Sequence, residues 1–465
     1  MVKVEIDAAK AVGTIKPMHA VNNGPLIGRR TQKRSNFNTF KEARIPYSRN
    51  HDASFCAGYG GENIVDVHAI FKNFDNDPYD PASYDFTLTD IFLQNILDAG
   101  TQIFYRLGSK IEHCVKKYGT LVPKDFQKWA VICEHIIRHY NCGWADGFRW
   151  NIEYWEIWNE PNLDADDAEN KRNWSGTTQE FYEFYDVASR HLKKTFPELK
   201  IGGIGSALTG RTYDWLEGFF AYLTRGDEPA PMDFFSWHIY LVEPAQMTEH
   251  SLKMRKLLDK YGYTDAESIL DEWNYVEDWG DGFCESIKTI IGPKGAACTL
   301  ATMCEAQNGN LDMLMYYDAR PTVYNGMFDF YTLERLPGYY PFYSFASLYE
   351  KKNQVYAASD DAMIYTVAAK DGDEMSAVVC YYTNERNTEN KTVSIDFKNV
   401  SDKKLYYILV DENHKFTQIH PEGNTIEMIP NSFVFITQDD MEEYLAANSE
   451  ISVEVQYDKN VCDNI

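Results

Sequence analysis

The chain has 465 residues, which is enough for one large domain or for two. Its net charge of −25 argues against a nucleic-acid partner, because neutralising phosphates requires a basic surface. No stretch approaches the roughly 20 apolar residues of a transmembrane helix, so no membrane partner is expected. The nine cysteines form no Cys-x-x-Cys pair, and residues 1–7 alternate like a strand rather than an export signal. We therefore expect reduced thiols in a cytoplasmic protein.

From about residue 14 to residue 350, short apolar runs alternate with amphipathic helical segments. Gly100 and Gly262 lie where helices should end, and Thr177 and Glu180 are positioned to form a capping box. Eight strands are expected, at residues 14–21, 44–48, 102–107, 152–158, 200–204, 234–240, 268–273 and 311–317. Eight strand–helix repeats predict an α/β fold whose parallel sheet closes into a (β/α)8 barrel of the TIM type, over residues 13–345.

The pattern changes after residue 350. Six short alternating segments joined by polar turns follow, at residues 363–369, 375–382, 391–397, 405–410, 425–429 and 433–437. This pattern is typical of an antiparallel sandwich, so we expect a C-terminal β-sandwich domain over residues 346–465. Residues 1–8 and the run 451–455 could both add strands to it. No flexible linker separates the two parts, so the sandwich should pack firmly against the barrel.

Two glutamates, Glu160 and Glu272, each end an apolar, strand-like run in a distant part of the chain. The first run reads Trp-Glu-Ile-Trp-Asn-Glu-Pro from residue 155, and the second reads Ile-Leu-Asp-Glu-Trp-Asn from residue 269. The carboxyl ends of barrel strands four and seven face each other across one mouth, so the two side chains can meet there. Two carboxyls, one protonated and one ionised, are what hydrolysis of a glycosidic bond needs. Either glutamate alone could be a salt-bridged residue at a strand end, but the pair favours catalysis.

The Asn159-Glu160-Pro161 sequence at strand four resembles the hallmark of the clan A retaining glycoside hydrolases. Within that clan the chain is most similar to glycoside hydrolase family 39, the β-xylosidase and α-L-iduronidase family. This resemblance implies a retaining exo-glycosidase in which Glu160 is the acid/base and Glu272 the nucleophile, with Asn159 binding a sugar hydroxyl. It also implies a small carbohydrate as substrate, without a metal or an organic cofactor. Some of the aromatic residues, which make up 15% of the chain, could stack on sugar faces, although core filling is their usual role.

Other readings of the same pattern stay open. An α-L-arabinosidase or another sugar specificity could use the same scaffold. A carbohydrate-binding protein that has lost catalysis is the alternative from another class, and the intact glutamate pair speaks against it. Assembly into a homo-oligomer is open as well.

The Ser-Arg-Asn-His sequence at residues 48–51 resembles the Arg-x-His of strand two. By that resemblance Arg49 holds the nucleophile and His51 contacts the sugar. An arginine beside Glu272 would keep that carboxyl ionised, as attack on the sugar requires. A structural ion pair is the alternative role for Arg49, and His68 competes with His51 for the sugar contact.

His238 and Tyr240 lie two residues apart and therefore share one face of a strand. They resemble the family's His-x-Tyr on strand six, in which the tyrosine hydroxyl lies near the nucleophile. At strand eight the chain departs from the family pattern, because Asp318 and Arg320 stand where a tryptophan and acidic residues are expected. These two residues could bind sugar hydroxyls or a charged group, or could pair with each other. Asp271, directly before Glu272, should point to the opposite face of its strand, and no role is assigned to it.

One further cluster has the spacing of a metal site. His135 and His139 are four residues apart on a predicted helix, and Cys133 and Cys142 lie nearby. The helix lacks the His-Glu-x-x-His motif and has the pattern of an ordinary outer barrel helix. We therefore expect no metal there.

Overall fold

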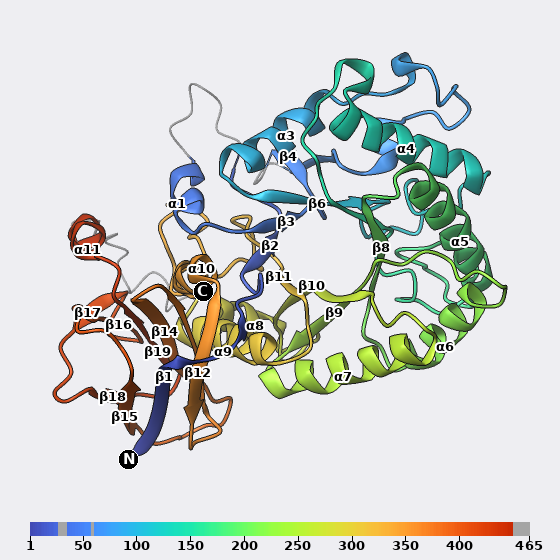
Figure 1. Ribbon diagram of the computed structural model, residues 1–465. Coiled ribbons are helices and arrows are strands. Elements are labelled where there is room, and N and C mark those ends of the chain that lie inside the picture. The colour runs from blue at the N-terminus through green and yellow to red at the C-terminus, as the bar shows by residue number, and fades with distance from the viewer. Residues whose placement is uncertain (27–34, 57–59, 450–465) are drawn as a thin grey trace.

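The computed structural model describes residues 1–26, 35–56 and 60–449 of the chain. It consists of a closed barrel of parallel strands and a curled sheet of nine strands beside it (Figure 1). Both the predicted barrel and the predicted C-terminal sandwich are confirmed. The run 451–455 lies outside the described residues.

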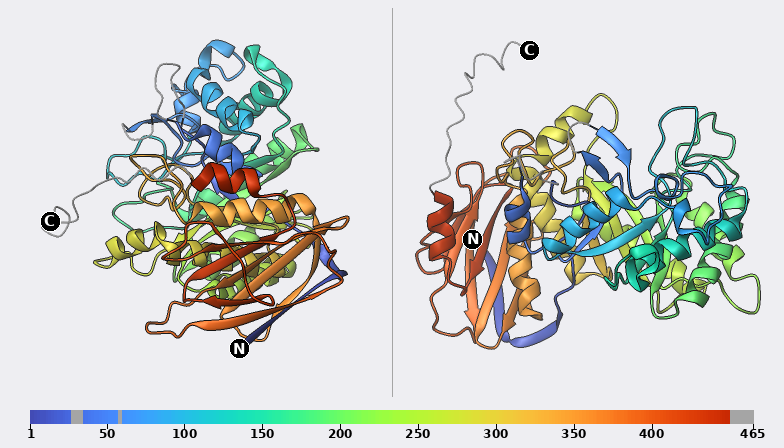
Figure 2. Two further views of the ribbon diagram at one scale, coloured as in Figure 1. Left: turned by 90° about the vertical axis from the view of Figure 1, so that its left-hand side faces the viewer. Right: turned by 90° about the horizontal axis from the view of Figure 1, so that it is seen from above.

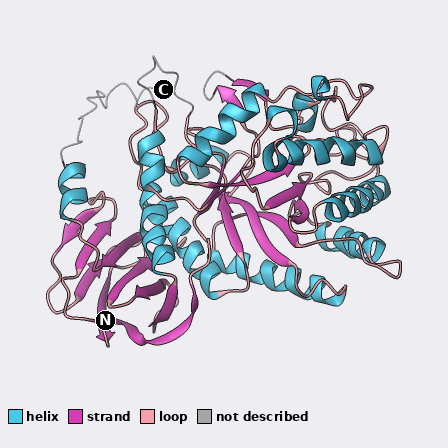
Figure 3. Ribbon diagram, turned by 45° about the horizontal axis from the view of Figure 1, so that its top comes forward, coloured by secondary structure: helices cyan, strands magenta, loops and turns pink. Residues whose placement is uncertain are grey.

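Eight parallel strands form the barrel, and each pairs with the next along the chain until the last meets the first (Figure 3). They are β2 (Ala20–Asn22), β3 (Tyr47–Arg49), β6 (Gln102–Leu107), β7 (Tyr154–Ile157), β8 (Lys200–Ser206), β9 (Phe234–Leu241), β10 (Glu267–Tyr275) and β11 (Met313–Tyr316). The strand expected at residues 14–21 is shorter and later than predicted. Residues 1–8 were expected to add a strand to the sandwich, and β1 (Val2–Thr14) pairs within the other sheet.

Helices surround the barrel on the outside (Figure 3). They are α1 (Phe37–Glu42), α2 (Val67–Ile70), α3 (Thr87–Asp98), α4 (Phe126–Cys142), α5 (Thr178–Thr195), α6 (Thr212–Leu223), α7 (Pro244–Lys260), α8 (Phe283–Ile290), α9 (Pro293–Asn308) and α10 (Tyr339–Lys351). A hairpin of β4 (Ser54–Cys56) and β5 (Gly60–Asn63) follows β3, and short 3-10 turns cover Pro81–Ser83 and Trp144–Asp146. The capping box predicted for α5 is present, with both of its hydrogen bonds between Thr177 and Glu180. None of the helices in the described part of the chain is both long and apolar enough to cross a bilayer.

The nine-stranded sheet is antiparallel except where β1 pairs with β15 in parallel. Its strands after β1 are β12 (Asn353–Ser359), β13 (Ile364–Asp371), β14 (Glu374–Tyr381), β15 (Lys391–Lys398), β16 (Tyr406–Val410), β17 (Thr417–Ile419), β18 (Thr425–Met428) and β19 (Ser432–Thr437), and the helix α11 (Glu442–Ser449) follows them. The first strand of the chain therefore lies between β12 and β15, strands more than 300 residues away in sequence (Figure 1).

Both faces of this sheet are buried at its central strands β13, β14 and β19. One face curls around its own apolar core, which includes Val4, Val379 and Ile436. The other face packs on α9 and α10 of the barrel, where Cys380 donates to the carbonyl of Ala297 at 3.3 Å. The sheet is thus fixed to the side of the barrel (Figure 2) and leaves the ends of the barrel strands open.

The barrel interior is built in layers. Its lowest layer is apolar and consists of seven inward side chains from six strands: Ala20, Phe104, Tyr154, Phe234, Ile269, Met313 and Met315. Because strand side chains alternate, the next inward residues are two positions further on. These are polar, and they include Arg49, Glu156 and Asp271, each fully buried. The site described next is built on this polar layer.

Candidate active site

A cavity of about 750 Å³ opens at the carboxyl ends of the barrel strands. Its walls come from β9 and β10 and from the segments that follow β3, β6, β7, β8, β10 and β11, as is usual for the active face of such barrels. The candidate residues that line it are His51, Glu160, His238, Tyr240 and Glu272. The sequence prediction thus brings together residues that lie up to 221 positions apart (51 to 272).

Glu160 follows β7 in a left-handed backbone conformation, with φ of +48°. This conformation is uncommon for a residue with a side chain, and its amide is held by a hydrogen bond of 2.9 Å to the carbonyl of Gly205. One carboxylate oxygen lies 2.9 Å from His238 Nδ1, and the other accepts from Asn173 Nδ2 at 3.0 Å. The side chain is 14% exposed, so it reaches the cavity while both oxygens remain hydrogen-bonded.

Glu272 points into the cavity because β10 contains a bulge. Leu270 pairs with Trp237 on β9 and Glu272 pairs with the next residue, His238, so Asp271 is an extra residue in the strand. The side chains of Asp271 and Glu272 therefore both turn inward. The prediction that Asp271 faces the opposite side of the strand is wrong, because it assumed unbroken alternation.

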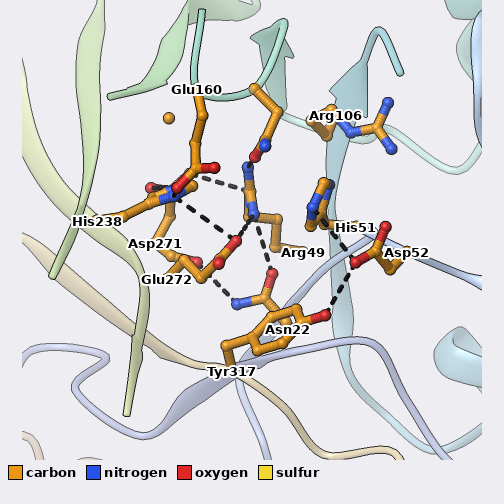
Figure 4. Close-up of polar contacts among 12 residues, drawn as sticks. Asn22, Arg49, His51, Asp52, Arg106, Glu160, His238, Asp271, Glu272 and Tyr317 are labelled. Carbon is orange, nitrogen blue, oxygen red and sulfur yellow. Dashed lines mark hydrogen bonds and ion pairs between the residues drawn. The ribbon is translucent and has the colours of Figure 1, made fainter. Parts of the chain in front are cut away.

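Three groups surround the Glu272 carboxylate, and Figure 4 shows two of them, Arg49 and His238. The Tyr240 hydroxyl donates to Oε1 at 2.7 Å, and Arg49 Nη1 donates to Oε2 at 3.3 Å. The Nδ1 atom of His238 lies 3.7 Å from Oε2. Two cationic side chains and a hydroxyl thus favour the ionised form of this glutamate.

The two glutamates approach each other closely over the cavity. Oxygen atoms of Glu160 and Glu272 and a ring nitrogen of His238 all lie within 4.8 Å of one another. The same three atoms could surround a cation. However, His238 contacts carboxylates through both ring nitrogens, as a protonated imidazole does, and a protonated ring cannot ligate a metal.

Arg49 lies beneath this pair and is fully buried. Its Nε is 2.7 Å from Glu156 and 3.0 Å from Asp271. The guanidinium also donates to the side-chain oxygens of Asn22 at 3.2 Å and Asn159 at 2.7 Å. Arg49 therefore holds Glu272 and also forms a structural ion-pair network, so both predicted roles apply.

Burial and charge set the protonation of these groups. Burial raises the pKa of Glu272 to about 6, against the opposing effect of His238 and Arg49. Burial also raises the pKa of Glu156 to about 8, although Arg49 opposes the rise. For Asp271 burial acts in the same direction, but Arg49 and His238 outweigh it and lower the pKa to about 2. Burial would lower the pKa of His238, but the carboxylates of Glu272 and Asp271 raise it to about 10.

The chain is similar to known proteins in sequence and in fold. The family model of the glycosyl hydrolases family 39 matches residues 2–270, more than half of the chain. The chain belongs to glycosyl hydrolases family 39. The match contains Glu160 and ends two residues before Glu272.

Two relatives and two solved structures illustrate the similarity. The chain is 26% identical to a β-xylosidase of Caldicellulosiruptor saccharolyticus over 198 residues, which are 40% of this chain and 37% of that protein. It is 25% identical to an α-L-iduronidase of Canis lupus familiaris over 42% of this chain and 31% of that protein. The matched region thus spans about a third of the length of these relatives.

The structural similarity covers almost the whole chain. A glucosidase from Croceicoccus marinus superimposes with a TM-score of 0.74 at 20% identity, over 94% of this chain and 98% of that one. A monomeric β-xylosidase from Caulobacter crescentus superimposes with a TM-score of 0.66 at 15% identity, over 94% and 99%. At these identities the similarity shows a common fold.

The remaining candidates of this family 39 chain are placed differently. His51 lines the main cavity, whereas His68 lines a separate cavity of about 230 Å³ behind Trp158. Asn159 is 1% exposed and accepts a hydrogen bond from Arg49, so its side chain is oriented by the buried layer. Of the two histidines, His51 is therefore the one that can contact a ligand beside Glu272.

Asp318 and Arg320 face each other rather than the cavity. Their side chains form an ion pair at 2.6 Å, and Asp318 also accepts from Asn23 and Thr322 at 3.2 Å each. Neither residue lines the cavity. Of the roles left open for them, the mutual ion pair is the one found, and it anchors the end of β11 below Tyr317.

The suspected zinc cluster has ordinary structural partners. His135 Nδ1 lies 2.8 Å from the carbonyl of Val131, and His139 contacts the carbonyl of Trp144 and the carboxylate of Asp90 at 2.9 and 3.1 Å. Within the described ranges, the only group of three or more residues spaced for a metal ion is the one around His238.

Sequence reasoning missed three residues of the site. Glu156 and Asp271 belong to the buried layer, and Asn173 binds Glu160 from the loop before α5. Glu156 could have been found, since strand alternation places it two positions above the inward Tyr154. Asn173 carries no such signal, because an irregular loop has no period.

We predict that Arg49→Met lowers the free energy of unfolding by about 3–5 kcal/mol at pH 8, because it leaves buried carboxylates without their cation. Without that cation the folded-state pKa of Asp271 rises above that of the unfolded chain, and the pKa of Glu156, which is already above it, rises further. Their protonation then relieves the loss, so the deficit should shrink as the pH is lowered from about 8 to about 5. Urea denaturation of both proteins across this range measures it.

Arg190→Met is the matched control, because it removes an ion pair with Asp186 in which the arginine is 40% exposed. Arg190→Met should change the free energy of unfolding by no more than about 1 kcal/mol. An Arg49→Met deficit that is small, or the same at both pH values, would contradict the assigned role.

Proposed function

We propose that this chain is a retaining exo-glycosidase that removes a neutral sugar, of the β-xylosidase type, from short oligosaccharides or glycosides. The observation that carries the proposal is the approach of the Glu160 and Glu272 oxygens to within 4.8 Å over one cavity. Retaining enzymes have carboxyls about 5–5.5 Å apart, whereas inverting enzymes need about 6.5–9.5 Å to admit a water molecule. Two of the similar proteins are named β-xylosidases.

The mechanism follows from the position of each glutamate. Glu272 attacks the anomeric carbon while Glu160 gives its proton to the glycosidic oxygen, so that the bond to the leaving group breaks and an ester to Glu272 forms. Glu160, now ionised, takes a proton from a water molecule that attacks the same carbon and releases Glu272. Tyr240 and Arg49 stabilise Glu272 as the attacking anion.

The walls of the cavity favour a neutral sugar of small size. A volume of about 750 Å³ is within the range of small-ligand sites, roughly 300–1,000 Å³. Among the described residues that line the cavity, one is a lysine or an arginine, namely Arg172. Its guanidinium already donates to the Asp164 carboxylate at 2.7 and 3.1 Å. A sugar carboxylate would find no free cation there, which favours a xyloside over a uronide. The aromatic rings of Trp279, Phe283 and Tyr324 offer stacking surfaces.

The thiols support a reducing compartment, and we propose the cytoplasm. Seven cysteines are free in the structure, and three of them, Cys114, Cys142 and Cys284, are exposed. Exposed free thiols are unusual in proteins that work under oxidising conditions.

A panel of nitrophenyl glycosides tests the sugar. We expect the β-xyloside to be hydrolysed fastest and the first product to keep the β configuration in an NMR time course. If the α-L-arabinoside were hydrolysed instead, the proposed sugar specificity would be wrong and the proposed mechanism would still hold. Binding of sugars without turnover of any glycoside would favour the non-catalytic alternative, and an inverted product would contradict the double displacement.

We predict that Glu160→Ala lowers kcat/KM by about 10²–10⁴ for glycosides with poor leaving groups, because the proton donor is lost. For a dinitrophenyl glycoside the loss of kcat/KM in this variant should be much smaller, since that leaving group needs no proton. Azide should then restore turnover of the trapped intermediate and yield a glycosyl azide, which mass spectrometry detects.

Two other variants serve as comparisons for Glu160→Ala. Glu272→Ala should be inactive on every leaving group, because no nucleophile remains. Glu183→Ala, on the exposed face of α5, should behave as wild type. If Glu160→Ala slowed all leaving groups equally, Glu160 would not be the acid.

We predict that Tyr240→Phe shifts the acid limb of the kcat/KM profile to higher pH. The tyrosine hydroxyl donates to the Glu272 carboxylate and lowers its pKa, so its loss raises the pH at which the nucleophile protonates. Activity at pH 6 should fall about tenfold or more, as expected for a lost hydrogen bond to a charged group. Tyr324→Phe is the control, since Tyr324 lines the same cavity without a bond to Glu272. Equal acid limbs in the two variants would refute this role of Tyr240.

A further inference from the structure

Asp271 is a third carboxylate of the site that the two-glutamate mechanism does not use. The bulge in β10 turns it inward beside Glu272, where it is fully buried. Its Oδ2 lies 3.0 Å from Arg49 Nε and its Oδ1 lies 3.3 Å from His238 Nε2. Neither oxygen has a hydrogen bond, so these contacts are ionic. A buried carboxylate of this kind is stable only beside cations.

His238 contacts a carboxylate through each of its ring nitrogens. Nε2 faces Asp271 at 3.3 Å, while Nδ1 lies 2.9 Å from Glu160 and 3.7 Å from Glu272. A neutral imidazole has one nitrogen lone pair, which would point either at the anion of Asp271 or towards the anion of Glu272. Only the imidazolium places positive charge beside both anions, and its contact with Asp271 through Nε2 is ionic rather than a hydrogen bond. The ring is 2% exposed, so water cannot replace these partners.

The charges around the ring balance if His238 is positive. The titratable groups that face it are Glu160 after β7, Asp271 and Glu272 on β10, and His51 after β3, with Arg49 across Gly205. Burial lowers the pKa of His51, which leaves that ring neutral. Arg49 and His238 then offset Asp271 and the ionised Glu272.

A second carboxyl of the buried layer completes this balance. Glu156 accepts from Ser236 at 2.6 Å, and burial raises its pKa to about 8, so it keeps its proton near neutral pH. In the proposed mechanism Glu160 carries a proton before the reaction, and the site is then neutral as a whole.

We propose that Asp271 is a positioning residue that holds His238 as an imidazolium, and that this imidazolium is the shared counter-ion of Glu160 and Glu272. The proposal rests on the proposed glycosidase function. Before bond cleavage the negative charge is on Glu272 and Glu160 carries the proton. When Glu272 forms its ester and Glu160 gives its proton to the leaving oxygen, the negative charge moves to Glu160. His238 contacts both positions, neither gains nor loses a proton, and so stabilises both ends of the transfer.

The test is a titration of His238 in the protein labelled with 15N-histidine, with the ring signals assigned by comparison with His238→Gln. In the wild type the imidazolium signals should persist from pH 6 to above pH 9. In Asp271→Asn, which keeps the shape and removes the charge, the ring should titrate at least about one pH unit lower. Asp318→Asn is the matched control, because it also removes a buried aspartate charge without touching His238. It should leave the titration of His238 unchanged.

Kinetics supply a second readout. In Asp271→Asn the alkaline limb of both kcat and kcat/KM should move to lower pH, because His238 loses its charge sooner. At pH 8 both constants should fall about tenfold or more, as for a lost charged partner. A purely structural role for Asp271 would lower both constants without moving the limb.

Each failure points to one proposal. A neutral His238 at pH 7 in folded, active wild type would overturn this inference alone, and this measurement needs no variant that might fail to fold. A wild type that hydrolyses no glycoside would overturn the proposed function instead. An unchanged His238 titration in folded Asp271→Asn would remove Asp271 from the role assigned to it.

Discussion

The site depends on one buried cation. Burying a guanidinium in the barrel interior costs several kcal/mol unless carboxylates compensate it. Here Glu156 and Asp271 lie within 3.0 Å of its Nε, and Glu272 lies 3.3 Å from Nη1. These partners come from β7 and β10, on opposite sides of the barrel from each other, so Arg49 on β3 fixes the position of both strands relative to the cavity. The charge that stabilises the fold here also orients the nucleophile.

The bulge in β10 is the second constraint, and it explains why the interior can hold so many charges. A regular strand would turn only one of Asp271 and Glu272 inward, and the other would face the surrounding helices. The extra residue lets one aspartate reach down to Arg49 while the glutamate beside it stays at the cavity. Gly205 makes room on the facing side, because a Cβ there would lie 3.0 Å from His238 Nε2 and 3.1 Å from Arg49 Nη2. Its φ of +58° also favours glycine.

Much of this arrangement could be predicted from the sequence, for identifiable reasons. Strand and helix periods are local, so the eight barrel strands and the later sheet could be read from residue patterns, and the Asn-Glu-Pro motif marked Glu160. Periods do not show where a strand begins, so the first barrel strand was expected at residues 14–21 although β2 covers Ala20–Asn22. They also fail at a bulge, which is why Asp271 was placed on the wrong face. Whether Asp318 met a ligand or Arg320 depended on a tertiary contact that spacing alone does not determine.

The two glutamates have the same chemistry, so their different roles must come from their surroundings. Glu272 receives a hydroxyl donor and two cationic side chains, and its carboxylate is 9% exposed. Glu160 is held by the amide of Asn173 and by His238, and it is the more exposed of the two at 14%. The glutamate with more positive partners is better suited to remain an anion and attack. The one nearer the opening can pass a proton to a departing group and later receive one from water. Because His238 contacts both, neither role can change without affecting the other.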